Sequence, residues 1–86
     1  MIFAWHVEKA VANLKKHGVD FREAATVFGD PLSTTFPDED HSIAERRFLT
    51  IGESLHGQLL VVAHTEENTT IRIISARRAM RNERKF

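Results

Sequence analysis

The stretch from Ile71 to Arg78, Ile-Arg-Ile-Ile-Ser-Ala-Arg-Arg, constrains the fold of this chain more than any other segment. Its isoleucines predict a buried strand, yet one arginine lies in the middle and two more follow where the strand ends. A guanidinium among isoleucines is costly to bury unless an anion or a carboxylate meets it. Two interpretations stay open: an ion pair inside the protein, or a phosphate site, because the planar fork of arginine fits two phosphate oxygens at a time.

The residues before this strand predict its antiparallel partner. Gln58 to His64 holds a continuous apolar run, as expected for a strand that is covered on both faces. Thr65 to Thr69 is a polar loop of hairpin length. The register stays open: a three-residue loop would place His64 opposite Arg72 on one side of the sheet, whereas a two- or four-residue loop would place it opposite Ile71.

Upstream of the hairpin, a short apolar lead gives way to a helical pattern. Met1 to Trp5 predicts an edge strand or an extended lead-in. Four apolar residues then recur at i, i+3, i+4 and i+7, which is one stripe of an amphipathic helix: Val7, Ala10, Val11 and Leu14. The helix ends at His17-Gly18, where glycine can adopt the left-handed cap. Lys15, Lys16 and His17 therefore lie where the helix dipole favours cations.

The remaining elements are shorter. Asp20 and Glu23 have capping-box spacing for a second, two-turn helix, which Gly29-Asp30-Pro31 ends. A strand is expected next over Leu32 to Phe36. A helical turn over Ser42 to Arg46 then leads into another strand over Arg47 to Gly52. After Ser75 as N-cap, Ala76 to Phe86 has helix-forming composition with few apolar contacts.

These elements predict one α+β domain over residues 1–86, with two N-terminal helices packed on an antiparallel sheet of about four strands and a short C-terminal helix. A domain of this size buries only roughly 60–65% of its unfolded surface, so its stability should be modest unless a partner adds to it. Cysteine is absent, and no apolar run approaches the roughly 20 residues that span a bilayer. We therefore expect a soluble, unexported, cytoplasmic protein without disulfides.

The charge of the chain is unevenly distributed. The formal net charge is zero, which argues against a protein held on nucleic acid by bulk charge alone. Residues 1–43, however, hold four Lys/Arg against seven Asp/Glu, and residues 44–86 hold eight against five. An anionic ligand is therefore expected on the second half of the chain.

An acidic stretch from Pro37 to His41 raises the question of a metal site. Asp38, Asp40 and His41 are of the types that ligate divalent metals, but no second ligand group with recognisable spacing exists elsewhere in the chain. A plain turn is the better interpretation. We predict neither a metal nor a cofactor.

Several separate stretches carry a resemblance that covers essentially the full length of the chain. They are Trp5 with Lys9 and Asn13, Lys16-His17-Gly18-Val19 with Phe21, Asp30-Pro31, Arg47 to Gly52, His64-Thr65, and Ile71 to Arg77. Together they identify a chain that resembles the BrnT family, toxins of type II toxin-antitoxin systems. The resemblance implies a fold similar to RelE toxins and ribonuclease activity. It also implies that a BrnA-like antitoxin neutralises the toxin, and that the toxin is associated with operator DNA only indirectly, through this antitoxin. It leaves open a dimer or a heterotetramer with the antitoxin.

The residues offer candidates for metal-independent RNA cleavage, in which the substrate's own 2'-hydroxyl is the nucleophile. Histidine suits proton transfer near neutral pH, which makes His17 and His64 candidates for base and acid. Arg47, Arg72 and Arg77 are the candidates for stabilising the developing charge. Lys16, Trp5 and Arg78 are candidates for binding the substrate. The chain departs from the family pattern at His6, where an acidic residue is expected, and at Glu67, where a basic residue often occurs.

Two rival functions remain. In the first, the arginines form internal ion pairs and the protein is a non-catalytic module that modulates the antitoxin's binding to operator DNA. In the second, Asp38, Asp40 and His41 serve a metal-dependent nuclease. Under the preferred interpretation, we expect the antitoxin to cover the basic second half of the chain.

Overall fold

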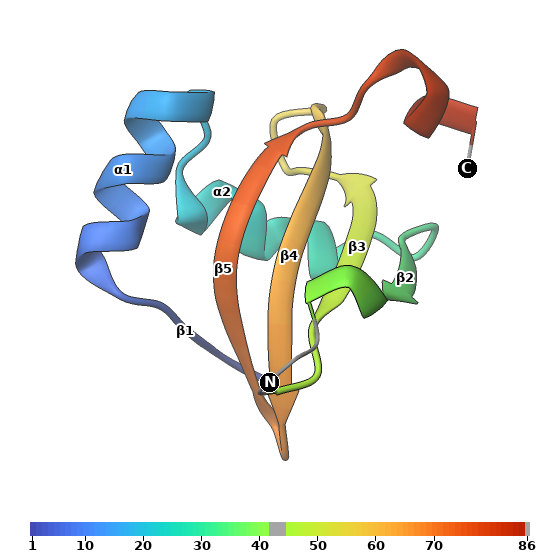
Figure 1. The fold of residues 1–86 in the computed structure, drawn as a ribbon. Helices are drawn as coiled ribbons and strands as arrows, with labels where there is room; N and C mark the ends of the chain where they lie inside the picture. Colours follow the sequence, from blue (N-terminus) through green and yellow to red (C-terminus); the bar gives the residue numbers. More distant parts are fainter. Residues whose placement is uncertain (42–44, 86) are drawn as a thin grey trace.

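The computed structural model describes residues 1–41 and 45–85, and they form a single sheet with helices on one side (Figure 1). The strands are β1 (Ile2–Ala4), β2 (Thr34–Pro37), β3 (Phe48–Glu53), β4 (Leu59–Glu67) and β5 (Thr70–Arg78). The helices are α1 (Val7–His17) and α2 (Phe21–Thr26), with 3-10 turns η1 (Val27–Gly29), η2 (Glu39–His41) and η3 (Arg81–Lys85). The α+β class is therefore confirmed.

The sheet differs from the expected one in its strand count and in one strand direction. Its order is β1-β5-β4-β3-β2, which makes five strands instead of about four. The apolar lead becomes edge strand β1, which pairs in parallel with β5, whereas the other pairs are antiparallel. The sheet is thus mixed, because its first and last strands lie side by side and run in the same direction.

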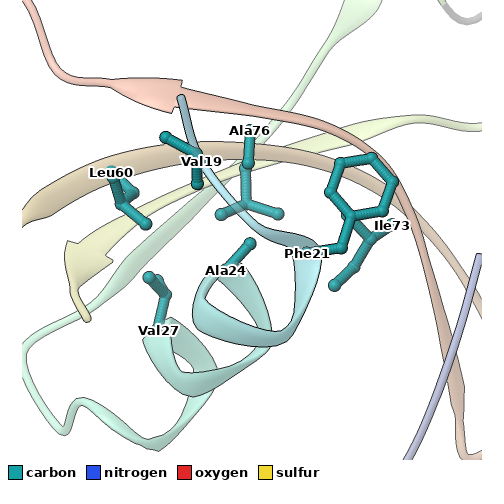
Figure 2. Packing of buried hydrophobic residues seen from close by; sticks show 8 residues of the cluster. Val19, Phe21, Ala24, Val27, Leu60, Ile73 and Ala76 are labelled. Atoms are coloured by element: carbon teal, nitrogen blue, oxygen red, sulfur yellow. The ribbon is translucent and has the colours of Figure 1, made fainter. Parts of the chain in front are cut away.

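The main core lies between the sheet and α2. Figure 2 shows Phe21, Ala24 and Val27 against side chains from β4 and β5. This cluster of fully buried residues comprises Val19, Phe21, Ala24, Val27, Leu60, Val62, Ile73 and Ala76. The i, i+3 spacing of the α2 residues accounts for their sharing one face of the helix. In Figure 1, α2 passes behind β4 and β5, so the opposite face of these strands is turned towards the viewer.

Helix α1 forms where its apolar period predicts it, but it turns a different side to the sheet. Val7, Val11 and Leu14 are 69%, 50% and 49% exposed, whereas Asn13 is buried. The Asn13 amide binds the backbone of β5, where Ala76 N–H donates to Oδ1 and Nδ2 donates to the Ala76 carbonyl. Nδ2 also donates to the carbonyl of Val19. These bonds fix the rotation of α1 about its axis, so that Ala10 packs against the core while the rest of the apolar stripe faces outwards.

The β4–β5 hairpin turns through Asn68 and Thr69, a two-residue loop in which Asn68 has a positive φ of 55°. His64 pairs with Ile73, so neither expected partner of His64 is correct. The register shifts at Ala63/His64, where β5 contains one residue more than β4, a β-bulge.

The expected helix over Ala76 to Phe86 is wrong in its first part. Strand β5 continues to Arg78, because Ala76 pairs with Val62 and its N–H and C=O bind Asn13. Tertiary hydrogen bonds thus override a composition that favours a helix. The later part forms only the short turn η3, and Phe86 lies outside the described residues.

The other expected elements have small boundary changes. Strand β2 begins at Thr34, since Leu32 is exposed, and β3 begins at Phe48. The acidic stretch contains the 3-10 turn η2, in agreement with the turn expected there. The helical turn expected over Ser42 to Arg46 falls largely on residues outside the described part. In the part that is described, no helix has both the length and the apolar character needed to cross a membrane.

Gly52 in β3 lies where there is no room for a side chain. A Cβ there would lie 2.8 Å from both Ser33 Cβ and Val27 Cγ1. We expect Gly52→Ala to destabilise the protein by about 1–3 kcal/mol, because neither neighbour is the end of a long flexible side chain. Thermal unfolding should show a midpoint at least about 4 °C lower. Gly29→Ala is the matched control, because a Cβ at Gly29 meets nothing within 4 Å; an equal loss in both variants would contradict the steric explanation.

Candidate functional site

The side chains of β4 alternate between the two faces of the sheet. Leu60 and Val62 face the helices, while Val61 belongs to a second buried cluster on the opposite side. We call this opposite side the outer face. On it, Thr65, Ala63 and Val61 of β4 pair with Arg72, Ser75 and Arg77 of β5. The outer face therefore carries two of the predicted site residues.

The β-bulge is what brings Arg72 and Arg77 to the same face. Five positions separate them, so regular alternation would direct their side chains to opposite faces. Ile74 is the extra residue between the pairs His64–Ile73 and Ala63–Ser75, and it shifts the alternation by one. The outer face gains its second arginine from this irregularity.

Arg72 is exposed, and the expectation of a charge buried among isoleucines is wrong. Ile71 and Ile73 face the core, and strand alternation turns Arg72 away from them. Its guanidinium needs no internal anion and is accessible to an external one.

Arg47 extends the same row across the sheet. Its carbonyl accepts a hydrogen bond from Asp38 N–H at 2.8 Å, which continues the pairing of β2 and β3 by one residue. Because Phe48 pairs with His64, Arg47 falls beside Thr65, which in turn pairs with Arg72. At the usual strand spacing, the backbones of Arg47 and Arg72 lie roughly 10 Å apart. The row Arg47–Thr65–Arg72 therefore has the Thr65 hydroxyl in its middle and one arginine on each side of it.

A histidine and a polar hollow adjoin this row. Arg72 Nη1 lies 3.4 Å from Nε2 of His6, the exposed residue that precedes α1. Beside Arg72 there is a hollow of about 460 Å³ at the hairpin end of the sheet. It is lined by Glu45, Thr65, Glu67, Asn68, Thr69, Thr70 and Arg72. This volume and its polar lining provide room for a ribose or a base next to Arg72.

Arg77 is already paired with a carboxylate of the protein. Its Nη1 and Nη2 donate to Glu83 Oε1 and Oε2 at 2.7 and 2.8 Å. The hydrogen bond from Arg77 is the main reason why the pKa of Glu83 is lowered to about 2, and the pKa of Arg77 is raised in return. This two-bond ion pair holds η3 against the end of β5. Arg77 thus matches the ion-pair interpretation more closely than Arg72 does.

His64 lies in the core, directed away from the outer face. It is 0% exposed, its ring stacks on Phe48, and the edge contact with Phe28 has ring centres 4.9 Å apart. Nε2 lies 2.7 Å from Thr50 Oγ1, while Nδ1 has no hydrogen-bond partner among the described residues. His64 cannot touch RNA in this arrangement.

Burial of His64 predicts a loss of stability in acid. Loss of hydration lowers its pKa from 6.5 to about 4, although the Thr65 backbone acts in the opposite direction. The folded protein keeps the ring neutral while the unfolded chain takes up a proton, so stability is full above about pH 6.5 and is lost as pH falls towards 4. The loss should approach roughly 3 kcal/mol.

Urea unfolding at about pH 7.5 and about pH 4.5 measures this loss. The Glu66 carboxylate lies 3.5 Å from Nδ1 and faces the same ring, so a second ionisable group adjoins His64. His64→Gln should therefore be compared with His56→Gln, which replaces an exposed histidine. We expect a smaller acid loss in the His64 variant; equal losses in both would contradict the assignment to His64.

The remaining predicted residues lie elsewhere. Lys16 and His17 are at the C-terminal end of α1, and Arg78 is at the end of β5, at the same end of the molecule in Figure 1. Arg78 is opposite Leu60 and so directed to the other side of the sheet from Arg77. Trp5 packs edge-on against Phe21 with ring centres 5.9 Å apart. The candidates thus divide into the outer-face row, the α1–β5 end and the core.

The structure tests the metal-site hypothesis only in part. Among the side chains that the structure describes, no group of three or more His, Cys, Asp or Glu is arranged to hold a metal ion. The side chain of His41 lies outside the described part, so this observation leaves the His41 hypothesis untested.

The fold and the site define a small single-sheet α+β protein, with α1 and α2 on one face and a group of arginines on the other. A family model described as "Ribonuclease toxin, BrnT, of type II toxin-antitoxin system" matches residues 5–83. The chain therefore belongs to the BrnT family of ribonuclease toxins, and membership of such a system implies an antitoxin partner. A search of the curated proteins found no match.

A solved structure supports the fold. The 1.1 Å crystal structure of the Brucella abortus ribonuclease toxin BrnT is similar, with a TM-score of 0.71 and 24% identity, over 94% of this chain and 100% of that chain. The expected comparison with RelE toxins is corrected in detail, since the sheet has five mixed strands and is followed, up to residue 85, by the short 3-10 turn η3.

Three residues of the site were not among the predicted ones. Thr65 was assigned to a loop, although it continues β4. Glu83 lies six residues after Arg77, a spacing that would not make them neighbours on the expected helix. His6 was noted only as a departure from the family pattern. That departure was a usable signal, because a histidine before a helix in a sequence rich in arginines is a candidate for proton transfer.

Proposed function

We propose that this toxin cleaves RNA endonucleolytically and without a metal ion, with the RNA backbone bound across the outer face. The row Arg47–Thr65–Arg72 supports this proposal most strongly, because it presents guanidinium groups on either side of one strand. Arginine binds phosphate oxygens in pairs, and preorganised cations stabilise charge that develops on them. The adjoining hollow has room for part of a neighbouring nucleotide.

In the proposed reaction, the 2'-hydroxyl of one nucleotide attacks the adjacent phosphate. Arg72, exposed at the β5 end of the row, would bind the non-bridging oxygens, and Arg47 would neutralise charge on the same backbone. Arg77 would contribute less, since Glu83 already neutralises it; we assign to it the positioning of η3 beside the site. Lys16 and Arg78 would meet a more distant part of the RNA.

Neither predicted histidine meets the row. His64 is buried on the other face of the sheet, where it would position β3 against β4 through Thr50. His17 lies at the C-terminal end of α1. We therefore keep His17 as a secondary candidate for contact with RNA, and Trp5 as a packing residue.

The proposed partner is a BrnA-like antitoxin in the cytoplasm, which would contact operator DNA while the toxin does not. The outer face collects Arg47, Arg72 and Arg77 from the basic second half of the chain. An acidic or extended antitoxin segment bound there would exclude RNA from the same arginines. The dimer and the heterotetramer remain predictions.

The test uses antitoxin-free toxin, end-labelled RNA, and buffers with and without EDTA. We expect internal cleavage in both buffers, with a 2',3'-cyclic phosphate on one product and a 5'-hydroxyl on the other. Cleavage that stops in EDTA and returns with added Mg²⁺ would instead support the metal-dependent rival.

The non-catalytic rival has one observation in its favour, the Arg77–Glu83 pair, which is the kind of internal pairing it requires. It predicts that folded, antitoxin-free toxin leaves RNA whole. Circular dichroism of the same sample establishes folding, so an inactive folded preparation would favour this rival over the nuclease.

A further inference from the structure

We infer that His6 is the residue that takes the proton from the attacking 2'-hydroxyl. This inference rests on the function proposed above, because it assigns a group to the same outer-face site. His6 Nε2 lies 3.4 Å from Arg72 Nη1, so a phosphate held by Arg72 would be next to the imidazole. A proton acceptor must lie within about 2.6–3.2 Å of the hydroxyl, or act through one water, and proximity to the phosphate-binding group is the first requirement for this.

The contact with Arg72 also indicates the state of the His6 ring. A guanidinium can only donate hydrogen bonds, so the ring nitrogen that faces it is the one with a free lone pair. Nε2 is then the acceptor and the proton of the neutral ring is on Nδ1. This is the form that a general base needs before the reaction.

The position of His6 leaves its side chain free for this role. It is the N-cap residue of α1, yet its side chain makes no capping hydrogen bond, and it is exposed. Of the histidines whose side chains the structure describes, His6 is the one in contact with Arg72. Arg72, from β5, contributes a charged group in contact with it.

The proposed step conserves atoms and charge. When Arg72 turns its N–H groups to the phosphate, Nε2 of His6 is released and accepts the proton of the 2'-hydroxyl. The 2'-oxygen forms a bond to phosphorus, and the bond from phosphorus to the 5'-oxygen breaks. A solvent water protonates the departing 5'-oxygen and becomes hydroxide, which is neutralised when the imidazolium gives up its proton. The products are a 2',3'-cyclic phosphate, a 5'-hydroxyl and an imidazolium that returns its proton to the solvent.

The experiment compares His6→Gln, His6→Asp and His56→Gln by their rates of RNA cleavage as a function of pH. His6→Gln keeps a polar side chain but cannot take a proton, so its rate should fall about 10²–10⁴-fold and lose the rise with pH. His6→Asp restores a proton acceptor and should recover part of the rate, with the rise moved to lower pH. His56→Gln, at an exposed loop histidine, should match the parent protein.

The outcomes separate this inference from the proposed function. If His6→Gln cleaves at the parent rate with the parent pH dependence, while Arg72→Ala is inactive, His6 is not the base and the RNA site on the outer face stands. Glu45, which lines the hollow with Arg72, is the competing acceptor; loss of the pH dependence in Glu45→Gln but not in His6→Gln would overturn the inference. Unfolding midpoints of all variants exclude a loss of folding.

Discussion

Replacing Arg72 with alanine is expected to lower the rate of RNA cleavage by about 10²–10³-fold while leaving the fold intact. The reason is its place in the sheet: Arg72 is exposed on the outer face, between Thr65 of β4 and the edge strand β1. Removing its guanidinium removes donors from the developing charge, but leaves no buried group without a partner. Single-turnover cleavage of a labelled RNA measures the loss, and circular dichroism checks the fold.

Two further variants sharpen this prediction. Arg72→Lys keeps the charge without the planar fork, so its rate should lie between those of the parent protein and Arg72→Ala. Arg22→Ala is the matched control, because Arg22 is an exposed arginine of α2, paired with Asp20 on the other side of the sheet. Equal losses in Arg22→Ala and Arg72→Ala would indicate a general effect of positive charge, and would contradict a specific site on the outer face.

The ion pair at Arg77 refines the interpretation of the arginine-rich strand. Before the structure, the strand over Ile71 to Arg78 allowed either internal pairing or a phosphate site for its arginines. The structure shows the internal pairing at Arg77, which is bound to Glu83 by two hydrogen bonds, while Arg72 is exposed beside His6 and is the arginine for which we propose phosphate binding. A structural role for Arg77 and the proposed functional role for Arg72 thus fall on two arginines that a single β-bulge brings to the same face.

The local features of this fold could be predicted because they depend on local periodicity. The capping-box spacing of Asp20 and Glu23 predicted α2, and the apolar run before His64 predicted β4. Each pattern depends only on neighbouring residues within one helix or strand, so the sequence alone is enough to recognise it. The family could also be predicted, because it depends on several short stretches found in order along the chain.

The errors concern relations between elements. No local pattern marks the extra residue at Ile74, yet it decides which face Arg77 occupies. The helix expected from Ala76 fails because Asn13, 63 residues away, binds the backbone of that residue. The apolar stripe of α1 was assigned to the core by its period, whereas the same asparagine turns it outwards. The predicted histidines failed to meet the arginines for a similar reason, since strand alternation directs His64 into the core.

Asn13 is accordingly the residue whose replacement should cost the most stability. Asn13→Ala leaves three buried backbone groups without partners: the N–H and the carbonyl of Ala76, and the carbonyl of Val19. Each unsatisfied buried group costs about 1–3 kcal/mol, part of which water entering the space can recover. We expect a total loss of roughly 3 kcal/mol, a large share of the stability of so small a domain. The thermal midpoint should fall by more than about 10 °C.

The control and the alternative substitutions test whether hydrogen bonding or packing is responsible. Asn82→Ala removes an exposed asparagine in η3 and should change the midpoint little. Asn13→Leu has a similar volume but no hydrogen bonds, so it should be as harmful as Asn13→Ala if the bonds to β5 matter. Asn13→Asp keeps the acceptor for Ala76 N–H but places a carboxylate against two carbonyl oxygens, and should be destabilised as well. Full stability of Asn13→Leu would show that α1 is held by packing alone. The rotation of α1 would then need another cause, and Val7, Val11 and Leu14 would be free to turn into the core as their spacing predicts.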